Sequence, residues 1–148
     1  MANEIDNIEL RFLKLSDYED LKETMVEAYK TMPSSFWKEI QIKTLIEKFS
    51  QGQVVLIIKN QIAGCALSII INKDDFEDRH TYKDITSDFT FDTHTNEGDT
   101  LYGIDVFIKP QFRGLRLGKR LYDFRKNLCE QLNLSSIVFG GRIPNYHK

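Results

Sequence analysis

The chain has 148 residues, of which 41% are hydrophobic and 28% are charged, with 20 Lys and Arg against 22 Asp and Glu. This length corresponds to one domain that can bury a core without a structural metal, and two Cys are too few for a disulfide framework. The N-terminus lacks the regions of a signal peptide, and no segment reaches the roughly 18–20 apolar residues of a membrane span. We therefore expect one cytoplasmic domain over residues 1–148, without a membrane partner.

Hydrophobic periodicity predicts eight elements in the order β-α-α-β-β-β-α-β. Residues 8–15 alternate as a strand, and Ser16 is a candidate N-cap for a helix that reaches about residue 30. A break at Pro33 precedes a second helix over residues 36–49. Residues 53–59 and 62–71 predict a hairpin joined through Asn60 and Gln61, and residues 101–108 predict a strand that Pro110 ends. An apolar stripe over residues 117–132 predicts a helix, and residues 136–140 predict a last strand.

The segment between two of these strands, residues 72–99, is long and acidic. It holds nine acidic residues against three Lys and Arg, a net charge of −6. Loops of this length are usually functional or disordered. Two interpretations stay open, a solvated excursion on the surface and a lid that faces an acceptor.

Positive charge is concentrated in residues 106–126, which hold seven basic residues and one acidic residue, a net charge of +6. Because the whole chain carries −2, the remainder carries −8. A cationic segment on an acidic domain suggests a site for one compact anion. Nucleic acid is not an expected partner, because a wide basic face with aromatic stacking platforms is not evident.

Within this segment, a strand, a proline, a turn with two glycines and a helix follow one another. The first turn of a helix leaves backbone N–H groups without partners, and its dipole attracts anions. Gly114 and Gly118 permit close approach of the anion, and Arg113, Arg116 and Lys119 add charge. The spacing excludes a Walker loop, and the dinucleotide fingerprint G-x-G-x-x-G is absent. The turn therefore predicts a pyrophosphate cradle.

The run Arg113-Gly114-Leu115-Arg116-Leu117-Gly118 resembles motif A of the GNAT N-acetyltransferase superfamily, [R/Q]-x-x-G-x-[G/A] after a strand. Arg116 replaces the central glycine of that pattern. The order of predicted elements also matches, so the resemblance covers nearly the whole chain. It implies an α+β, three-layer fold, in which helices flank a mixed, largely antiparallel sheet.

The resemblance also implies acetyl-CoA as co-substrate. The backbone of Val106, Phe107 and Ile108 would hold the pantetheine arm, and the thioester would lie in a gap where the last two predicted strands splay apart. The pyrophosphate would be held by the turn, whose members are Arg113, Gly114, Leu115, Arg116, Leu117, Gly118 and Lys119.

Asp105 lies near the position where some family members carry a carboxylate that acts as general base. Tyr146 lies near the position of a tyrosine that acts as general acid. Each has an ordinary alternative: Asp105 as a solvent-facing or ion-paired strand residue, and Tyr146 as a terminal aromatic. Trp37, together with Tyr29, Met32 and Phe36, either packs in the core or borders the acceptor site. His80, His94 and His147 show no ligand spacing, so no metal is predicted.

The predicted function is an N-acetyltransferase whose amine acceptor is a small molecule or a protein. After residue 140 too few residues remain for the further helix and two strands of a complete GNAT domain, so a C-terminally truncated domain is expected. The segment from Gly140 to Lys148, together with residues 102–107 and 113–118, is similar to the GNAT domain fused ahead of a carbon–nitrogen hydrolase in some bacterial proteins. The alternative is therefore a non-catalytic acyl-CoA-binding or regulatory module of a larger protein. A homodimer or a C-terminal domain would complete the sheet edge.

Overall fold

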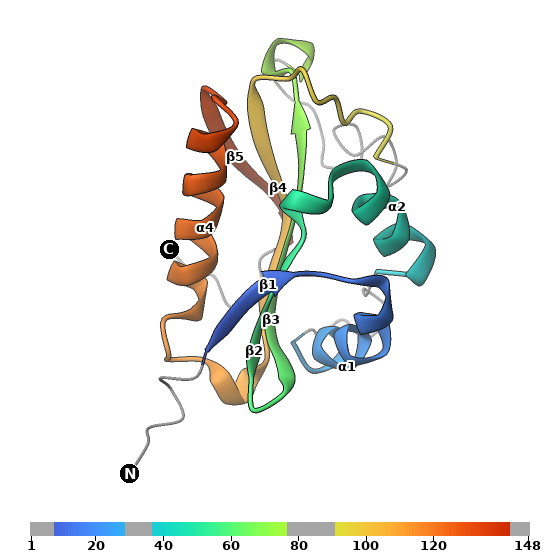
Figure 1. Ribbon diagram of the computed structural model, residues 1–148, viewed down its shortest axis with the longest axis vertical. Helices are drawn as coiled ribbons and strands as arrows, with labels where there is room; N and C mark the ends of the chain where they lie inside the picture. The colour runs from blue at the N-terminus through green and yellow to red at the C-terminus, as the bar shows by residue number, and fades with distance from the viewer. Residues whose placement is uncertain (1–7, 29–36, 77–90, 143–148) are drawn as a thin grey trace.

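The structure is a computed structural model that describes residues 8–28, 37–76 and 91–142. Figure 1 shows a central sheet with helices on both sides. The described elements are β1 (Glu9–Phe12), α1 (Tyr18–Ala28), α2 (Glu39–Phe49), β2 (Val54–Ile58), β3 (Gln61–Ile71), β4 (Thr100–Ile108), α4 (Leu117–Gln131) and β5 (Ser136–Arg142). Short 3-10 turns lie between several of them. The order predicted from periodicity is confirmed.

The sheet has five strands in the order β1-β2-β3-β4-β5. The first four pair antiparallel, and β4 pairs with β5 in parallel. A parallel pair needs a crossover connection, which α4 supplies. The predicted mixed, largely antiparallel sheet is therefore confirmed.

Two apolar layers hold the helices to the sheet. On one face, α1 and α2 bury Leu21 and Leu45 against alternate β3 residues such as Cys65 and Leu67. On the opposite face, α4 packs Leu121 and other apolar side chains against the sheet. Figure 1 shows the resulting three layers, with α4 alone on its side.

The entry to α1 differs from the prediction. A 3-10 turn, Leu15–Asp17, precedes the helix, so Ser16 is not its N-cap. The carboxylate of Asp17 accepts a hydrogen bond of 2.8 Å from the N–H of Lys14 and pairs with Arg11 at 2.8 Å. A carboxylate that is paired with Arg and caps the turn outcompetes a serine hydroxyl one residue earlier.

The hairpin between β2 and β3 turns one residue earlier than predicted. Lys59 and Asn60 both have positive φ, 54° and 63°, and Ile58 pairs with Gln61. Two residues with positive φ match the right-handed twist of the flanking strands. Asn is common at such positions, whereas Lys59 offered no local signal for a left-handed conformation.

The described ends of the acidic segment pack onto β3. The N–H of Thr95 donates to the carbonyl of Ile70 at 2.9 Å, and the N–H of Ile70 donates to Nδ1 of His94 at 3.0 Å. Phe91 is fully buried in the core beside α1 and α2. Residues 77–90 lie outside the described residues, so the lid interpretation stays untested, but the segment is not wholly a solvated excursion.

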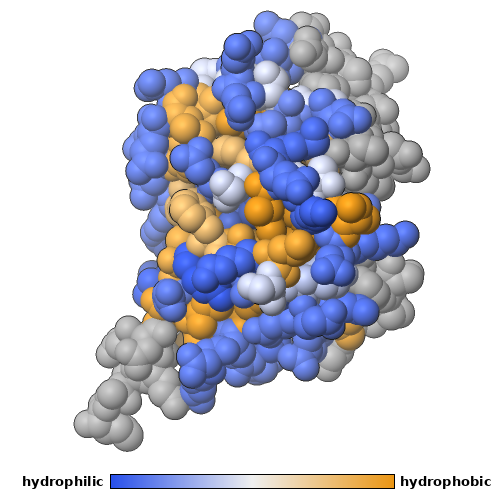
Figure 2. All heavy atoms as spheres, turned by 45° about the vertical axis from the view of Figure 1, so that its right-hand side comes forward, coloured by the Kyte–Doolittle hydropathy of each residue, from blue (hydrophilic) through white to orange (hydrophobic). Residues whose placement is uncertain are grey.

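Figure 2 shows that the side carrying α1 and α2 is mainly polar, with an irregular band of apolar atoms reaching the surface. Among the described residues, the exposed large apolar side chains are Leu10, Phe12, Val26, Ile40 and Tyr122. None of the described helices has the length and apolar character to cross a bilayer.

Candidate anion turn and acyl site

The connection from β4 to α4 is short and carries two left-handed residues. After β4 the chain forms a 3-10 turn, Pro110–Phe112, and then passes through Gly114 with a φ of 91° and Arg116 with a φ of 62°. Phe112 and Leu117 are buried on either side of these residues and fix the turn against the sheet. Glycine is the residue that suits such a conformation, so Arg116 holds the position at a cost in strain.

The start of α4 presents backbone donors without helical partners. The first hydrogen bond of the helix runs from the N–H of Arg120 to the carbonyl of Arg116 at 3.2 Å, and no side chain caps the helix. The N–H groups of Leu117, Gly118 and Lys119 therefore precede the helical ladder. A Cβ built on Gly118 meets no heavy atom within 4 Å, which leaves open space at this end of the helix.

The charges around this turn are exposed. Arg113, Arg116 and Lys119 lie at the surface, and Nζ of Lys119 pairs with Asp123 one helical turn later at 2.8 Å. Exposed cations, backbone donors and the positive end of the helix dipole act on the same small volume. This arrangement fits a phosphate or pyrophosphate group.

β4, which leads into the turn, is interrupted in the middle. The register with β3 shifts between Leu67 and Ser68, so Ile104 is an extra residue in β4, and the register with β5 is irregular at the same place. Pairing with β5 is regular from Thr100 to Gly103 and resumes at Asp105. The predicted splaying of these two strands is therefore not seen over residues 100–105, which pair with β5, and residues 106–108 pair with β3. Phe107 is buried there, and Val106 and Ile108 are half-buried against α4.

Asp105 lies directly after the extra residue and is only 1% exposed. Its Oδ2 accepts a hydrogen bond of 2.8 Å from the indole N–H of Trp37, and its Oδ1 accepts one of 2.9 Å from the N–H of Val106. It is thus neither a solvent-facing nor a strand-end residue. Two N–H donors on the two oxygens suit an ionised carboxylate.

Trp37 is a buried core residue, 4% exposed, that joins α1 to β4. Its carbonyl accepts a hydrogen bond of 2.7 Å from the Tyr18 hydroxyl, and its ring lies 5.8 Å from that of Phe91. The core interpretation of Trp37 is confirmed. Tyr29, Met32 and Phe36, grouped with it in the sequence, lie outside the described residues, as does the candidate acid Tyr146.

Sequence reasoning missed Arg125. It was counted only as one of the basic residues of the cationic segment, but in the structure it is 3% exposed beneath the sheet. A signal for this exists, because Arg125 follows Leu121 by four residues and precedes Leu128 by three, which places it on the apolar face of α4.

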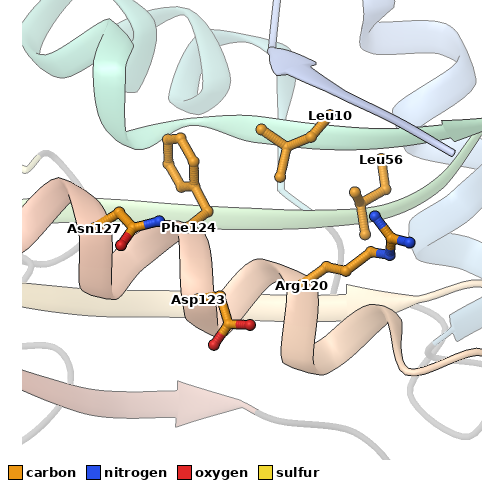
Figure 3. Close-up of a pocket in the computed structure, with 6 residues that line it drawn as sticks. All are labelled: Leu10, Leu56, Arg120, Asp123, Phe124 and Asn127. Atoms are coloured by element: carbon orange, nitrogen blue, oxygen red, sulfur yellow. The ribbon is translucent and has the colours of Figure 1, made fainter.

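A cavity of about 320 Å³ lies between α4 and the strands β1 and β2. Figure 3 shows Leu10, Leu56 and Phe124 converging on it, with Arg120, Asp123 and Asn127 along the helix. None of the predicted site residues lines this cavity. In the part of the chain that the structure describes, no cluster of three or more His, Cys, Asp or Glu side chains could hold a metal ion.

The chain is similar in sequence to a known protein family and to two proteins of one organism. The profile of the acetyltransferase (GNAT) family matches residues 18–147. The probable hydrolase YhcX of Bacillus subtilis (strain 168) is 44% identical over 112 residues, which cover 76% of this chain and 22% of that protein. The uncharacterized N-acetyltransferase YkwB of the same organism is 30% identical over 112 residues, 76% of this chain and 50% of that protein. The chain thus spans half or less of these two relatives.

Two solved structures share the fold. The loading GNATL domain of CurA from Lyngbya majuscula superposes with a TM-score of 0.74 at 25% identity, over 89% of this chain and 63% of that one. The GNAT-like decarboxylase GphF, solved with isobutyryl-CoA, superposes with a TM-score of 0.66 at 16% identity, over 78% of this chain and 56% of that one.

Proposed function

The chain belongs to the acetyltransferase (GNAT) family, and we propose that it transfers an acetyl group from acetyl-CoA to an amine. The observation that carries this proposal is the uncapped start of α4, where the N–H groups of Leu117, Gly118 and Lys119 precede the helical ladder, with open space around Gly118 and exposed cations beside it. The pyrophosphate of an acyl-CoA is an anion of the charge and size that such a helix end binds.

The bulged strand β4 supports the proposed binding of the pantetheine arm and its thioester. Residues 106–108 lead directly into the anion turn and pair with β3 along one edge, and we propose that an extended pantetheine arm hydrogen-bonds along their other edge as a strand does. The arm then runs from the turn at α4 toward Ile104 and Asp105. Acetyl-CoA supplies an activated thioester carbonyl, and a backbone N–H near the bulge stabilises the charge that develops on its oxygen.

We assign the removal of the amine proton to Asp105. The new bond joins the amine nitrogen to the acetyl carbon, the C–S bond breaks, and the ammonium proton passes to the carboxylate directly or through a water molecule. Because the Asp105 carboxylate is buried behind Trp37, this step requires access through the α1 and α2 side of the sheet. Tyr146 is the proposed acid for the leaving thiolate.

Titration calorimetry with acetyl-CoA and with CoA tests whether the chain binds these ligands. We expect both ligands to bind, and no heat near millimolar ligand would refute a role with acyl-CoA. A thiol-release assay with a panel of small amines and peptide amines then tests transfer. Turnover with one class of amine would identify the acceptor as a small molecule or a protein.

A second candidate is a non-catalytic acyl-CoA-binding module of a larger protein. The 44% identity to one part of the probable hydrolase YhcX favours it, because that relative is several times longer than the matched region. Binding of acetyl-CoA without turnover on any amine would support this alternative. In both cases we propose that a second copy or a further domain pairs with the outer edge of β5, which has no strand partner among the described residues.

A further inference from the structure

Arg125 is a charged residue in a place where a helix normally buries an apolar one. It belongs to α4, and its side chain is 3% exposed between the helix and the sheet. Burial lowers the pKa of its guanidinium to about 10, so the group remains charged near neutral pH. A buried cation of this kind persists only where specific acceptors compensate its lost hydration.

The acceptors of Arg125 are at the β4 bulge. Nη2 donates to the carbonyl of Leu67 and to the carbonyl of Asp105, each at 2.8 Å, and Nε donates to the Ser68 hydroxyl at 3.2 Å. Leu67 and Asp105 are register partners across β3 and β4, at the point where the register shifts. A bulge disturbs the ladder hydrogen bonds, and the guanidinium supplies donors there.

The same cation has its counter-charge on the opposite face of the sheet. The Asp105 carboxylate points to the α1 and α2 side and bonds to Trp37, whereas Arg125 approaches from the α4 side. The negative charge of Asp105 raises the pKa of Arg125 and so opposes the effect of burial. One residue therefore holds the carbonyl of Asp105 and balances its carboxylate.

We propose that Arg125 is the positioning residue of the acyl site, which fixes the bulge of β4 and thereby sets the direction of Asp105 and of the β4 backbone. This inference rests on the proposed transferase function and adds a residue to it. Arg125 lies two helical turns after the anion turn on the same helix, so α4 aligns the two ends of an acyl-CoA with one rigid element.

The test compares Arg125→Lys and Arg125→Met with Lys126→Met, which removes a charge from the next, exposed residue of α4. Lysine keeps the charge but cannot reproduce the guanidinium fork. We expect both Arg125 variants to lower kcat by roughly 10- to 100-fold, because a small displacement of the reacting groups is enough for that loss. The KM for acetyl-CoA and the Kd for CoA should change by less than about threefold, since the anion turn is intact. Lys126→Met should match the wild type.

A second readout does not depend on turnover. Trp37 is the single Trp of the chain, so its indole N–H gives one resonance in an NMR spectrum, and that N–H bonds to Asp105. We expect this resonance to shift in Arg125→Lys without any ligand and to stay in place in Lys126→Met. If Arg125→Met does not fold, Ser68→Ala removes only the contact to Nε and should give a smaller shift and a smaller loss of kcat.

Three results would overturn the proposal. Wild-type kcat in Arg125→Lys with only a lower melting temperature would leave Arg125 a purely structural role. A parallel loss of kcat and CoA affinity would make it part of the binding site. An unchanged Trp37 resonance would show that the bulge does not depend on it. If the wild-type chain binds acetyl-CoA without turnover on any amine, the transferase function fails, and the Trp37 resonance alone decides whether Arg125 positions the bulge.

Discussion

Replacing Gly118 by Leu separates two properties of the α4 terminus, the formation of the helix and the space left for an anion. Gly118 is the second residue of α4, and a Cβ built on it meets no heavy atom within 4 Å. The folded chain therefore has room for the side chain, and a helical glycine costs roughly 0.5–1 kcal/mol relative to alanine. We expect Gly118→Leu to be as stable as the wild type or up to about 1 kcal/mol more stable, which corresponds to a melting temperature about 2–4 °C higher.

CoA binding should respond in the opposite direction. A side chain on Gly118 has open space around its Cβ and is directed toward the N-terminus of α4, where the pyrophosphate is proposed to lie. A hydrogen bond to a charged group contributes about 1.5–3 kcal/mol, so the loss of one weakens binding by roughly tenfold or more and the loss of two by roughly 100-fold. Titration calorimetry with CoA and a thermal melt measure the two effects separately.

Glu130→Leu is the matched control, because Glu130 is exposed in the last turn of the same helix. It should leave the Kd for CoA unchanged. Wild-type affinity in a folded Gly118→Leu variant would contradict the placement of the pyrophosphate at this turn. If Gly118→Leu loses both affinity and stability, Gly118→Ala repeats the test with the smallest side chain that fills the space.

Three further outcomes are expected besides that for Arg125. Arg116→Gly should raise the free energy of unfolding by about 1 kcal/mol in a urea titration, because it removes the backbone strain of a non-glycine residue at a φ of 62°. An unchanged free energy of unfolding would contradict the presence of that strain. Asp105→Asn should keep CoA binding, lower turnover by roughly 10²- to 10⁴-fold and lower the melting temperature, because Arg125 loses its counter-charge; full activity would refute the base assignment. Burial lowers the pKa of His94, against a hydrogen bond from its Nε2 to Asn96 Oδ1 that raises the pKa. The stabilisation by His94 is therefore present above the unfolded pKa of about 6.5 and is lost as the pH falls. As the pH is lowered from about 7.5 to 5, the melting temperature should therefore fall more steeply for the wild type than for His94→Gln. Equal dependence of the two melting temperatures on pH would contradict this.

Most of the architecture could be predicted from hydrophobic patterns because the described helices bury one face, and the central strands β2, β3 and β4 are nearly continuous apolar runs that are buried on both faces. The stripe that predicted α4 includes Leu121 and Leu128, and both are buried in the structure. The details that escaped prediction depend on competition between local groups. Asp17 replaces Ser16 at the entry to α1 because Arg11, six residues earlier, reaches its carboxylate, and such a partner becomes visible only when β1 and α1 are placed in space.

One part of the candidate site could be predicted from the sequence and another part could not. The anion turn was predictable because its parts, the strand end, the glycines and the basic residues, are contiguous in the sequence. The link between Arg125 and Asp105 was not, because it joins residues 20 positions apart through backbone carbonyls. No side-chain pattern reports which carbonyls a bulge frees from the sheet ladder.

The bulge decides which face of the sheet carries the Asp105 charge. Tyr102 and Ile104 point to the α1 and α2 side, and beyond the extra residue Phe107 points there as well. In an unbroken strand Asp105 would face α4 together with Leu101 and would form an ordinary ion pair with Arg125. The bulge instead places the carboxylate next to Trp37 and leaves the guanidinium bound to carbonyls on the other side.

Gly103 is the sequence sign that such a break is near, because a glycine inside a strand often marks a bulge. The extra residue itself could not be identified, since both alternating sets of β4 contain apolar side chains. The sequence therefore allows Ile104 and Asp105 to face either side of the sheet, and only the burial of Phe107 and the hydrogen bond from Trp37 to Asp105 distinguish the two. A deletion of Ile104 makes Gly103 and Asp105 consecutive partners of Ser68 and Leu67, so it restores the unbroken register and keeps Asp105 on the α1 and α2 side. The Trp37 indole N–H should therefore keep Asp105 as its acceptor in this variant, and loss of that hydrogen bond would contradict the assignment of Ile104 as the extra residue.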